Sequence, residues 1–228
     1  MLINKFKDSC HDEDLLGMAI LTEKIEKEEL NQTWHELEGD TMLVWSVALD
    51  SIPVAKLLID RGASVHSTDW RGRAPIFHCE SVAMVDFLIS MGARVNVFDK
   101  IGSTPLHAVL QEGIDDVIRH FIKLGADVNA REGKRPPPLL ELIDSTPTTE
   151  NVQLLLSAGA IVNAQDKYGN TALHRSVHLG YPDIAKLLLE NGADIDVKND
   201  DGDMSWELAR MKWKIFKSVF EPYTKWRI

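Results

Sequence analysis

Several histidine and cysteine residues could carry out chemistry, and their spacing decides whether they do. A zinc-protease helix needs a second histidine four positions after the first, and after His35-Glu36 that position is Gly39. Cys10-His11 and His78-Cys79 pair a thiol with an imidazole, but adjacent helical residues point apart and no third ligand follows at zinc spacing. The sequence also lacks a glycine-rich phosphate loop. We therefore expect no catalytic residue, no metal, no cofactor and no enzymatic activity.

Composition limits the class of partner. The 228 residues include 25 basic and 35 acidic ones, and the net charge of -10 argues against binding to nucleic acid or an anionic membrane. No apolar run approaches the roughly 18 residues of a membrane span, and the first residues lack a secretory apolar core. Two cysteines cannot form a disulfide framework, which favours a reducing compartment. We expect an intracellular protein, cytoplasmic or nuclear, and favour a monomer.

The elements that must position any site follow from an internal repeat. The dipeptide Gly-Ala recurs five times, at 62, 92, 125, 159 and 192, with separations of 30, 33, 34 and 33 residues. Before each pair lies an apolar ridge with helical spacing, which the glycine can end in a left-handed turn. Tight-turn segments such as Asp99-Lys-Ile-Gly102 follow, and Thr104-Pro105 then provides a helix cap and a first helical residue. The predicted unit is turn, short helix, glycine, longer helix, glycine.

This pattern resembles the ankyrin repeat family. The motif G-x-T-P-L-H-x-A, the Leu-Leu ridge and G-A-D-V-N carry the resemblance, most closely over 103–129 and 170–196. It implies an all-α solenoid of helix-turn-helix units joined by β-turn or hairpin fingers. We expect about five repeats within 39–203, between an N-terminal helical cap at 1–38 and a C-terminal cap helix at 204–228. The repeats are placed at about 39–68, 69–98, 99–131, 132–165 and 166–198.

Two repeats depart from the pattern, and both ends fall outside it. The unit from Arg73 is three residues short, so we expect its first helix to be truncated, and Pro136-Pro137-Pro138 predicts a longer, stiffer finger. The N-terminal cap rests on an apolar helix face formed by Leu15, Leu16, Ala19, Ile20 and Ile25. Ala209, Trp213, Phe216, Phe220 and Tyr223 form a similar face near the C-terminus. This second face is expected to be the core of the cap, with a basic segment for a membrane surface or a partner groove as the alternative.

The resemblance gives the motif histidines a structural duty, which is to tie a helix start to neighbouring backbone. Five residues are expected to serve this motif: Thr104, Pro105, His107, Thr171 and His174. His120 stands where other repeats have a ridge residue such as Leu154. It is read as a partly exposed substitution, with a pH-sensitive packing site as the alternative.

The finger tips are the expected partner-binding surface, because exposed tryptophan, tyrosine and arginine anchor interfaces. The candidates are basic or apolar residues of the turn segments: Trp70, Arg71, Arg73, Phe98, Lys100, Ile101, Arg131, Lys134, Arg135, Lys167 and Tyr168.

The expected function is non-enzymatic binding of a folded protein, as an adaptor, scaffold or inhibitor-type regulator. The basic fingers predict a partner surface that is acidic or phosphorylated. Two alternatives stay open: an effector from a pathogen or virus that binds host proteins, in the host cytoplasm, or a repeat scaffold with an enzymatic site hidden in the N-terminal segment.

Overall fold

The structure is a computed structural model that describes Gly17 and residues 21–22, 24–26, 29–34, 39–145 and 147–224. Four residues of the predicted N-terminal cap (Leu15, Leu16, Ala19 and Ile20), Cys10-His11 and His35-Glu36 lie outside this described part. The chain divides into two compact units, Met1–Ala126 and Asp127–Ile228. Helices and isolated β-bridges are the regular structure of the described residues, so the predicted all-α solenoid is confirmed.

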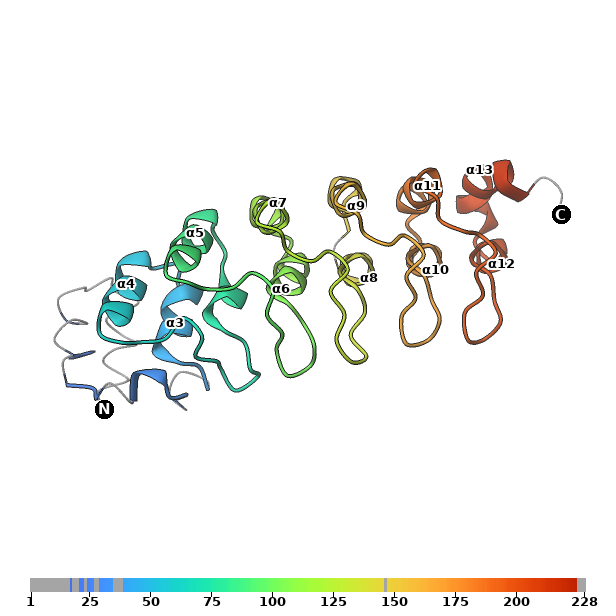
Figure 1. Cartoon of the computed structure of the whole chain (residues 1–228). Helices are drawn as coiled ribbons and strands as arrows, with labels where there is room; N and C mark the ends of the chain where they lie inside the picture. Colours follow the sequence, from blue (N-terminus) through green and yellow to red (C-terminus); the bar gives the residue numbers. More distant parts are fainter. Residues whose placement is uncertain are drawn as a thin grey trace. The chain divides into compact units, whose positions relative to one another are not determined.

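The first unit has two layers of helices, with finger loops extending beyond the inner layer (Figure 1). The inner layer consists of α3, η3 and α6, and η3 contacts both of its neighbours. The outer layer consists of α4, α5 and α7, and α5 contacts α7. The bounds are η1 Glu29–Asn31, α3 Met42–Ala48, α4 Ile52–Asp60, η3 Pro75–His78, α5 Val82–Ser90, α6 Pro105–Glu112 and α7 Asp115–Lys123.

The second unit repeats this arrangement. Its inner helices α8, α10 and α12 and its outer helices α9, α11 and α13 form the two layers, again with fingers on the inner side. The bounds are α8 Pro138–Asp144, α9 Thr149–Ser157, α10 Ala172–Leu179, α11 Pro182–Glu190, α12 Ser205–Arg210 and α13 Trp213–Thr224.

Apolar residues at helical spacing fill the space between the layers. In α7, Val117, Ile118 and Phe121 are buried, whereas Asp116 of the acidic first turn is exposed. This is the amphipathic pattern expected of a helix that packs one face on a neighbour. Because neighbouring repeats share their buried faces, each repeat depends on the next for its core.

The second repeat has lost most of its inner helix. Residues Pro75–His78 form one 3-10 turn, whereas α6 of the following repeat has eight residues. The predicted truncation is therefore confirmed. Cys79 leaves the turn with extended backbone, so the chain passes directly to the outer helix α5.

The residues after the last finger continue the repeat geometry. Glu207 accepts a hydrogen bond from the Met204 backbone N–H, 3.0 Å away, at the point where the earlier repeats use their motif histidine. Phe216 and Phe220 of α13 are fully buried, with ring centroids 6.2 Å apart. The apolar face of the C-terminal segment is therefore core, although Tyr223 at its end is exposed.

Candidate protein-binding surface

Each well-formed finger is organised by an acid or amide at the start of its turn. Asp99 accepts hydrogen bonds through Oδ1 from the N–H groups of Ile101 and Ser103, at 3.0 and 2.8 Å. The backbone closes the same turn from Gly102 N–H to the Asp99 carbonyl. Asp69, Asp166 and Asn199 make the corresponding bonds in their fingers. This side-chain arrangement mimics a backbone turn and fixes the tip.

Neighbouring tips are also joined to one another. In the first unit the Lys100 N–H donates to the Arg71 carbonyl at 3.0 Å, and Lys100 Nζ donates to the Trp70 carbonyl at 2.7 Å. In the second unit the Asp200 N–H donates to the Tyr168 carbonyl at 3.0 Å. Within each unit, these bonds hold adjacent tips at a fixed spacing, so their side chains form a pre-organised surface.

Large apolar side chains remain exposed at these tips. Trp70 is 54% exposed and Ile101 66% exposed, and they line an apolar hollow of about 350 Å³ together with Lys100. The Arg71 guanidinium lies 4.6 Å from the Trp70 ring centroid, and Lys167 Nζ lies 4.8 Å from that of Tyr168, which is 54% exposed. Such cation–π stacking spreads the basic groups over the aromatic faces.

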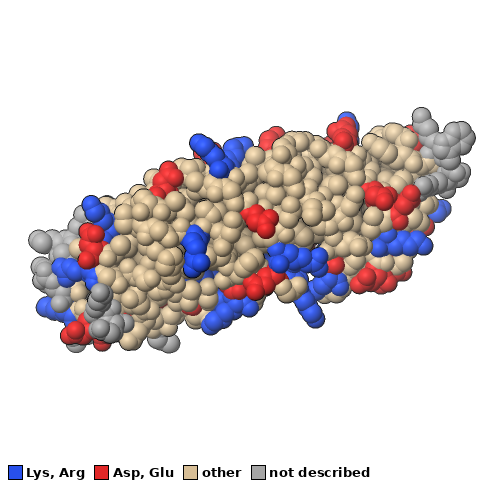
Figure 2. Space-filling model, viewed as in Figure 1, with Lys and Arg blue, Asp and Glu red and all other residues tan. Residues whose placement is uncertain are grey.

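The basic residues of the fingers divide into two groups. Arg71, Lys134 and Lys167 are exposed, whereas others are engaged in internal contacts. Arg73 Nε lies 2.9 Å from Asp69 Oδ2, and an Arg135 guanidinium nitrogen lies 2.9 Å from Glu141 Oε1. Arg131 donates to the Gln165 carbonyl at 3.0 Å. Figure 2 shows basic and acidic side chains interspersed over the visible face.

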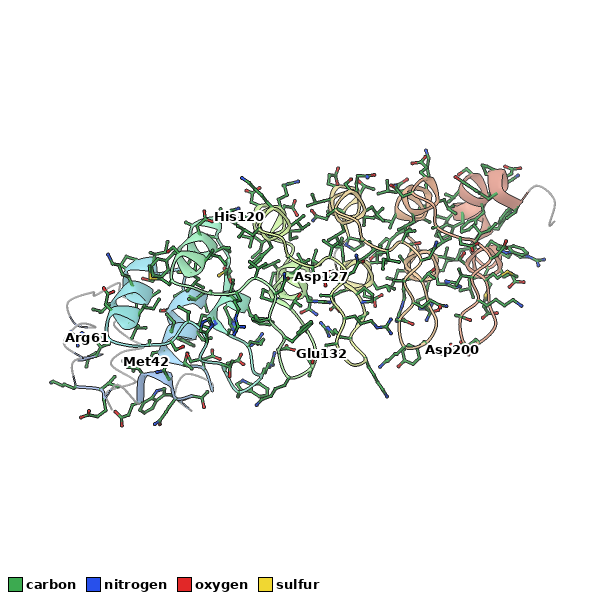
Figure 3. All side chains as sticks on the ribbon, viewed as in Figure 1. Met42, Arg61, His120, Asp127, Glu132 and Asp200 are labelled. Carbon is green, nitrogen blue, oxygen red and sulfur yellow. The ribbon has the colours of Figure 1, made fainter. Side chains whose placement is uncertain are left out.

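Some finger tips also carry acidic residues. Glu132 and Asp200 lie at two tips of the second unit, as Figure 3 shows. Phe98 of the first unit is 45% exposed beside its finger. The finger tips of each unit therefore expose both aromatic and charged side chains, with exposed basic groups at Arg71 in the first unit and at Lys134 and Lys167 in the second.

Asp69 is the most strongly perturbed of these carboxylates. Burial by itself would raise its pKa, but hydrogen bonds from the His78 ring, the Arg73 N–H and the Arg73 guanidinium outweigh burial and lower the pKa to about 2. Burial likewise opposes bonds from the Tyr168 N–H and the Arg175 guanidinium at Asp166, whose pKa is also lowered. Both groups are therefore charged structural anchors of their fingers at neutral pH.

The motif histidines lie at helix starts, away from solvent. His174 is buried, and its Nδ1 accepts the Thr171 backbone N–H at 3.2 Å. The ring proton is therefore on Nε2, which donates to the Asp203 carbonyl at 3.1 Å in the next finger. In the first unit, His107 Nδ1 accepts the Thr104 N–H at 3.1 Å, and Pro105 is the first residue of α6. These contacts use the imidazoles to join backbone segments.

One set of linking residues escaped the sequence reasoning. Asn163 Nδ2 donates to the Gly192 carbonyl at 3.2 Å, and its Oδ1 accepts the Asp194 N–H at 2.8 Å. Asn129 repeats both bonds one repeat earlier in the second unit, and Asn31 does so in the first. Each asparagine bridges to the loop after the next outer helix. The Val-Asn recurrence was the signal that could have revealed this role.

His120 and Cys79, the other groups considered for chemistry, lie away from the finger tips. His120 Nε2 lies 2.6 Å from Asp86 Oδ1, between the outer helices α7 and α5, and Figure 3 shows it on the layer opposite the fingers. The Cys79 thiol is buried, and burial, with the Asp50 charge, raises its pKa. Within the described residues, no three His, Cys, Asp or Glu side chains are grouped as a metal site would need. None of the described helices has the length and apolar character to cross a membrane.

Comparison with known proteins places the repeats in a family. Models of ankyrin repeats match residues 101–132 and, as three copies, 139–199. The chain belongs to the ankyrin repeat family. A solved structure, the ankyrin repeat domain of Bcl-3, a member of the IkappaB protein family, superposes with a TM-score of 0.77 over 93% of this chain and 96% of that one. At 24% identity, this likeness concerns the fold.

Relatives with similar repeats come from different kinds of proteins. Neurogenic locus notch homolog protein 1 of Xenopus laevis is 33% identical over 156 residues, which is 66% of this ankyrin chain. Ankyrin repeat and SOCS box protein 6 of Homo sapiens is 35% identical over 52% of the chain, and putative ankyrin repeat protein FPV022 of Fowlpox virus is 30% identical over 68%. The matches span 6%, 30% and 26% of those relatives' own lengths.

Proposed function

We propose that this chain is a non-enzymatic protein-binding module that holds a folded partner against its finger tips and inner helices. The observation that carries the proposal is the exposed, hydrogen-bonded pair of tips at Trp70, Arg71 and Ile101. Large apolar groups are costly to leave in water, and contiguous exposed ones mark interaction sites. Ankyrin repeats are an interaction fold, which supports the same reading.

The finer proposal concerns the partner's charge. Arg71 and Lys167 lie over aromatic rings, so each tip offers an apolar contact and a positive group together. An acidic or phosphorylated protein surface would complement these groups and approach faster at low salt. We propose an adaptor or regulator role on this basis, with Arg71, Lys134 and Lys167 as the charged contacts. Arg73 and Arg135 support the fingers through their own ion pairs.

The test is a comparative capture of proteins from cell lysate. The finger variant carries Arg71→Glu and Lys167→Glu, which reverse two exposed charges without breaking an ion pair of the described residues. The matched control carries Lys56→Glu and Lys217→Glu, two exposed lysines on the outer helices α4 and α13, with the same change in net charge. Captured proteins are compared by mass spectrometry after both variants are shown to fold like the wild type.

Proteins lost from the finger variant and retained by the control would support the proposal. Because rim charges act mainly on the association rate, a purified partner should then bind the finger variant more slowly by about tenfold or more at low salt. Equal capture by the two variants would contradict the assignment of binding to the finger tips.

A further inference from the structure

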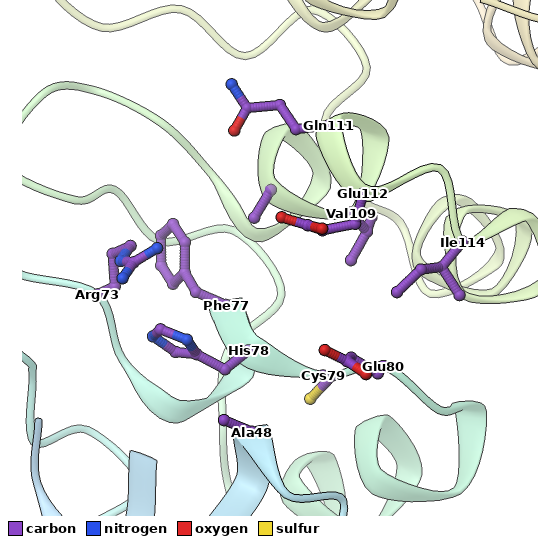
Figure 4. A pocket seen from close by; sticks show the side chains of 11 residues that line it. Ala48, Arg73, Phe77, His78, Cys79, Glu80, Val109, Gln111, Glu112 and Ile114 are labelled. Carbon is purple, nitrogen blue, oxygen red and sulfur yellow. The ribbon is translucent and has the colours of Figure 1, made fainter. Parts of the chain in front are cut away.

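The truncated inner helix leaves a pocket between two complete ones. A pocket of about 120 Å³ opens where η3 ends, bordered by Ala48 at the end of α3 and by Ala108 and Glu112 of α6. Phe77 and Val109, both buried, form part of its lining. This volume approaches that of a cavity of about 150 Å³ that admits benzene, so it suits the end of one side chain. Figure 4 shows the pocket with its lining residues.

The charges of the pocket are unbalanced. Arg73 and His78 line it, but both face Asp69, with nitrogens 2.9 and 3.5 Å from its Oδ2. Glu80 and Glu112 also line it, and their side chains form no hydrogen bond or ion pair within the described residues. The Arg73 charge is thus already neutralised by Asp69, and two carboxylates remain available.

A buried polar atom in the wall adds an independent observation. The Cys79 thiol is 1% exposed, lines the pocket and forms no hydrogen bond in the described part of the chain. Burial and the charge of Asp50 raise its pKa, so it is a neutral thiol, which is a weak acceptor and a poor nucleophile. The pocket therefore combines apolar walls, an unpartnered sulfur and two unpartnered carboxylates.

We propose that this pocket receives an arginine side chain of a partner protein. The apolar walls at Phe77 and Val109 suit the methylene stem, and the guanidinium can donate to both Glu80 and Glu112. Arginine fits better than lysine because its planar group is weakly hydrated and carries five donors. The inference rests on the proposed protein-binding function. The partner would then present an arginine to this pocket as well as the acidic surface that is proposed to face the finger tips.

The experiment uses the full chain and small probes in place of a partner. Capped arginine, N-acetyl-arginine methylamide, is titrated while the methyl signals of Ala48, Ala108 and Ile114 are followed by NMR. Capped citrulline has nearly the same shape without charge, and capped lysine has the charge without the planar fork. The matched charge variants are Glu80→Gln with Glu112→Gln in the pocket, and Asp183→Asn with Glu221→Gln on the exposed surface of the outer helices α11 and α13.

The expected result is saturable movement of the three methyl signals, with a millimolar dissociation constant for capped arginine. Capped citrulline should bind at least about tenfold more weakly, and so should capped arginine to the Glu80→Gln, Glu112→Gln variant but not to the control. Ala108→Leu, which fills the pocket and keeps both carboxylates, should also abolish binding.

Three results would overturn the proposal: no saturable movement up to about 50 mM, equal binding of citrulline, or equal binding of lysine. The assay uses no finger residue and no partner protein. Its failure would therefore leave the finger proposal standing, and unchanged capture by the finger variant would leave a positive pocket result standing.

Discussion

Replacing Asp69 by asparagine tests whether a buried, charge-paired carboxylate holds the second finger. The carboxylate accepts the N–H groups of Arg71 and Arg73, both at 2.8 Å, and the Arg73 guanidinium at 2.9 Å. Burial, which raises its pKa, is outweighed by these bonds and the His78 ring, and the pKa falls from 3.8 to about 2. A lowering of this size corresponds to about 2 kcal/mol of folding free energy.

The sign of the pH dependence follows from the lowered pKa. Asp69 binds a proton less readily in the folded state than in the unfolded state. The contribution of its carboxylate to the free energy of unfolding is therefore complete above about pH 4. It is lost as the pH falls towards about 2. Asp69→Asn should therefore reduce the free energy of unfolding by about 2 kcal/mol at neutral pH, and the difference from wild type should shrink in acid.

The assay is urea unfolding followed by circular dichroism, repeated from about pH 7 down to the lowest pH at which the wild type folds. Asp99→Asn is the matched control, because Asp99 makes the same two backbone bonds without an arginine or histidine partner. It should cost about 1 kcal/mol or less. The reasoning is refuted if the two variants lose equal stability at neutral pH, or if the Asp69→Asn difference stays constant in acid.

Two further predictions concern a helix start and a finger base. Desolvation lowers the pKa of His174, although the hydrogen bond to the Asp203 carbonyl acts to raise it. The stabilisation of the fold by the neutral His174 ring is therefore present above about pH 6.5 and is lost as the pH falls below that value. His174→Ala should cost about 2 kcal/mol at neutral pH and less at about pH 5 in urea unfolding, whereas the exposed His66→Ala should cost little at either pH. At Gly39, φ is +87° and an added Cβ would lie 2.6 Å from Trp70 Cδ1, so Gly39→Ala should destabilise the protein and shift the Trp70 indole NMR signal. Gly92 is the control, because its φ of +95° is similar but the space around it is open. Gly92→Ala should therefore cost only the backbone strain of about 1 kcal/mol. Equal losses of stability at the two glycines would contradict the role of the Trp70 contact.

Most of the repeat architecture could be predicted from the sequence, because its signals are local. The Gly-Ala spacing, the apolar ridges and the Thr-Pro starts depend on residues within one turn of a helix or finger. The shortened interval after Arg73 likewise predicted the truncated helix that the structure has at η3. The segment before Gly39 could not be predicted in this way, because its sequence lacks the repeat motif. Asn31 nevertheless makes the same bridging hydrogen bonds as Asn163.

The candidate site could be predicted only in part, because charge pairing depends on side chains from different segments. Arg71 and Arg73 look equivalent in sequence, yet one lies over Trp70 and the other is paired with Asp69. Arg135 looked like a free finger residue, and its partner Glu141 comes from the following helix. Sequence reasoning counted these charges but could not tell which were already neutralised.

The sequence by itself determined the repeat, the helical fold and the exposure of the finger turns, since each follows from the period and the residue types. Only the tertiary structure decided which groups remain available for a partner. The pocket at η3 shows the reason: it joins Ala48, Glu80 and Glu112 from three segments, and its free carboxylates matter because packing turns Arg73 and His78 towards Asp69. The sequence predicts the short helix, but the pocket beside it exists only because the neighbouring helices α3 and α6 are complete.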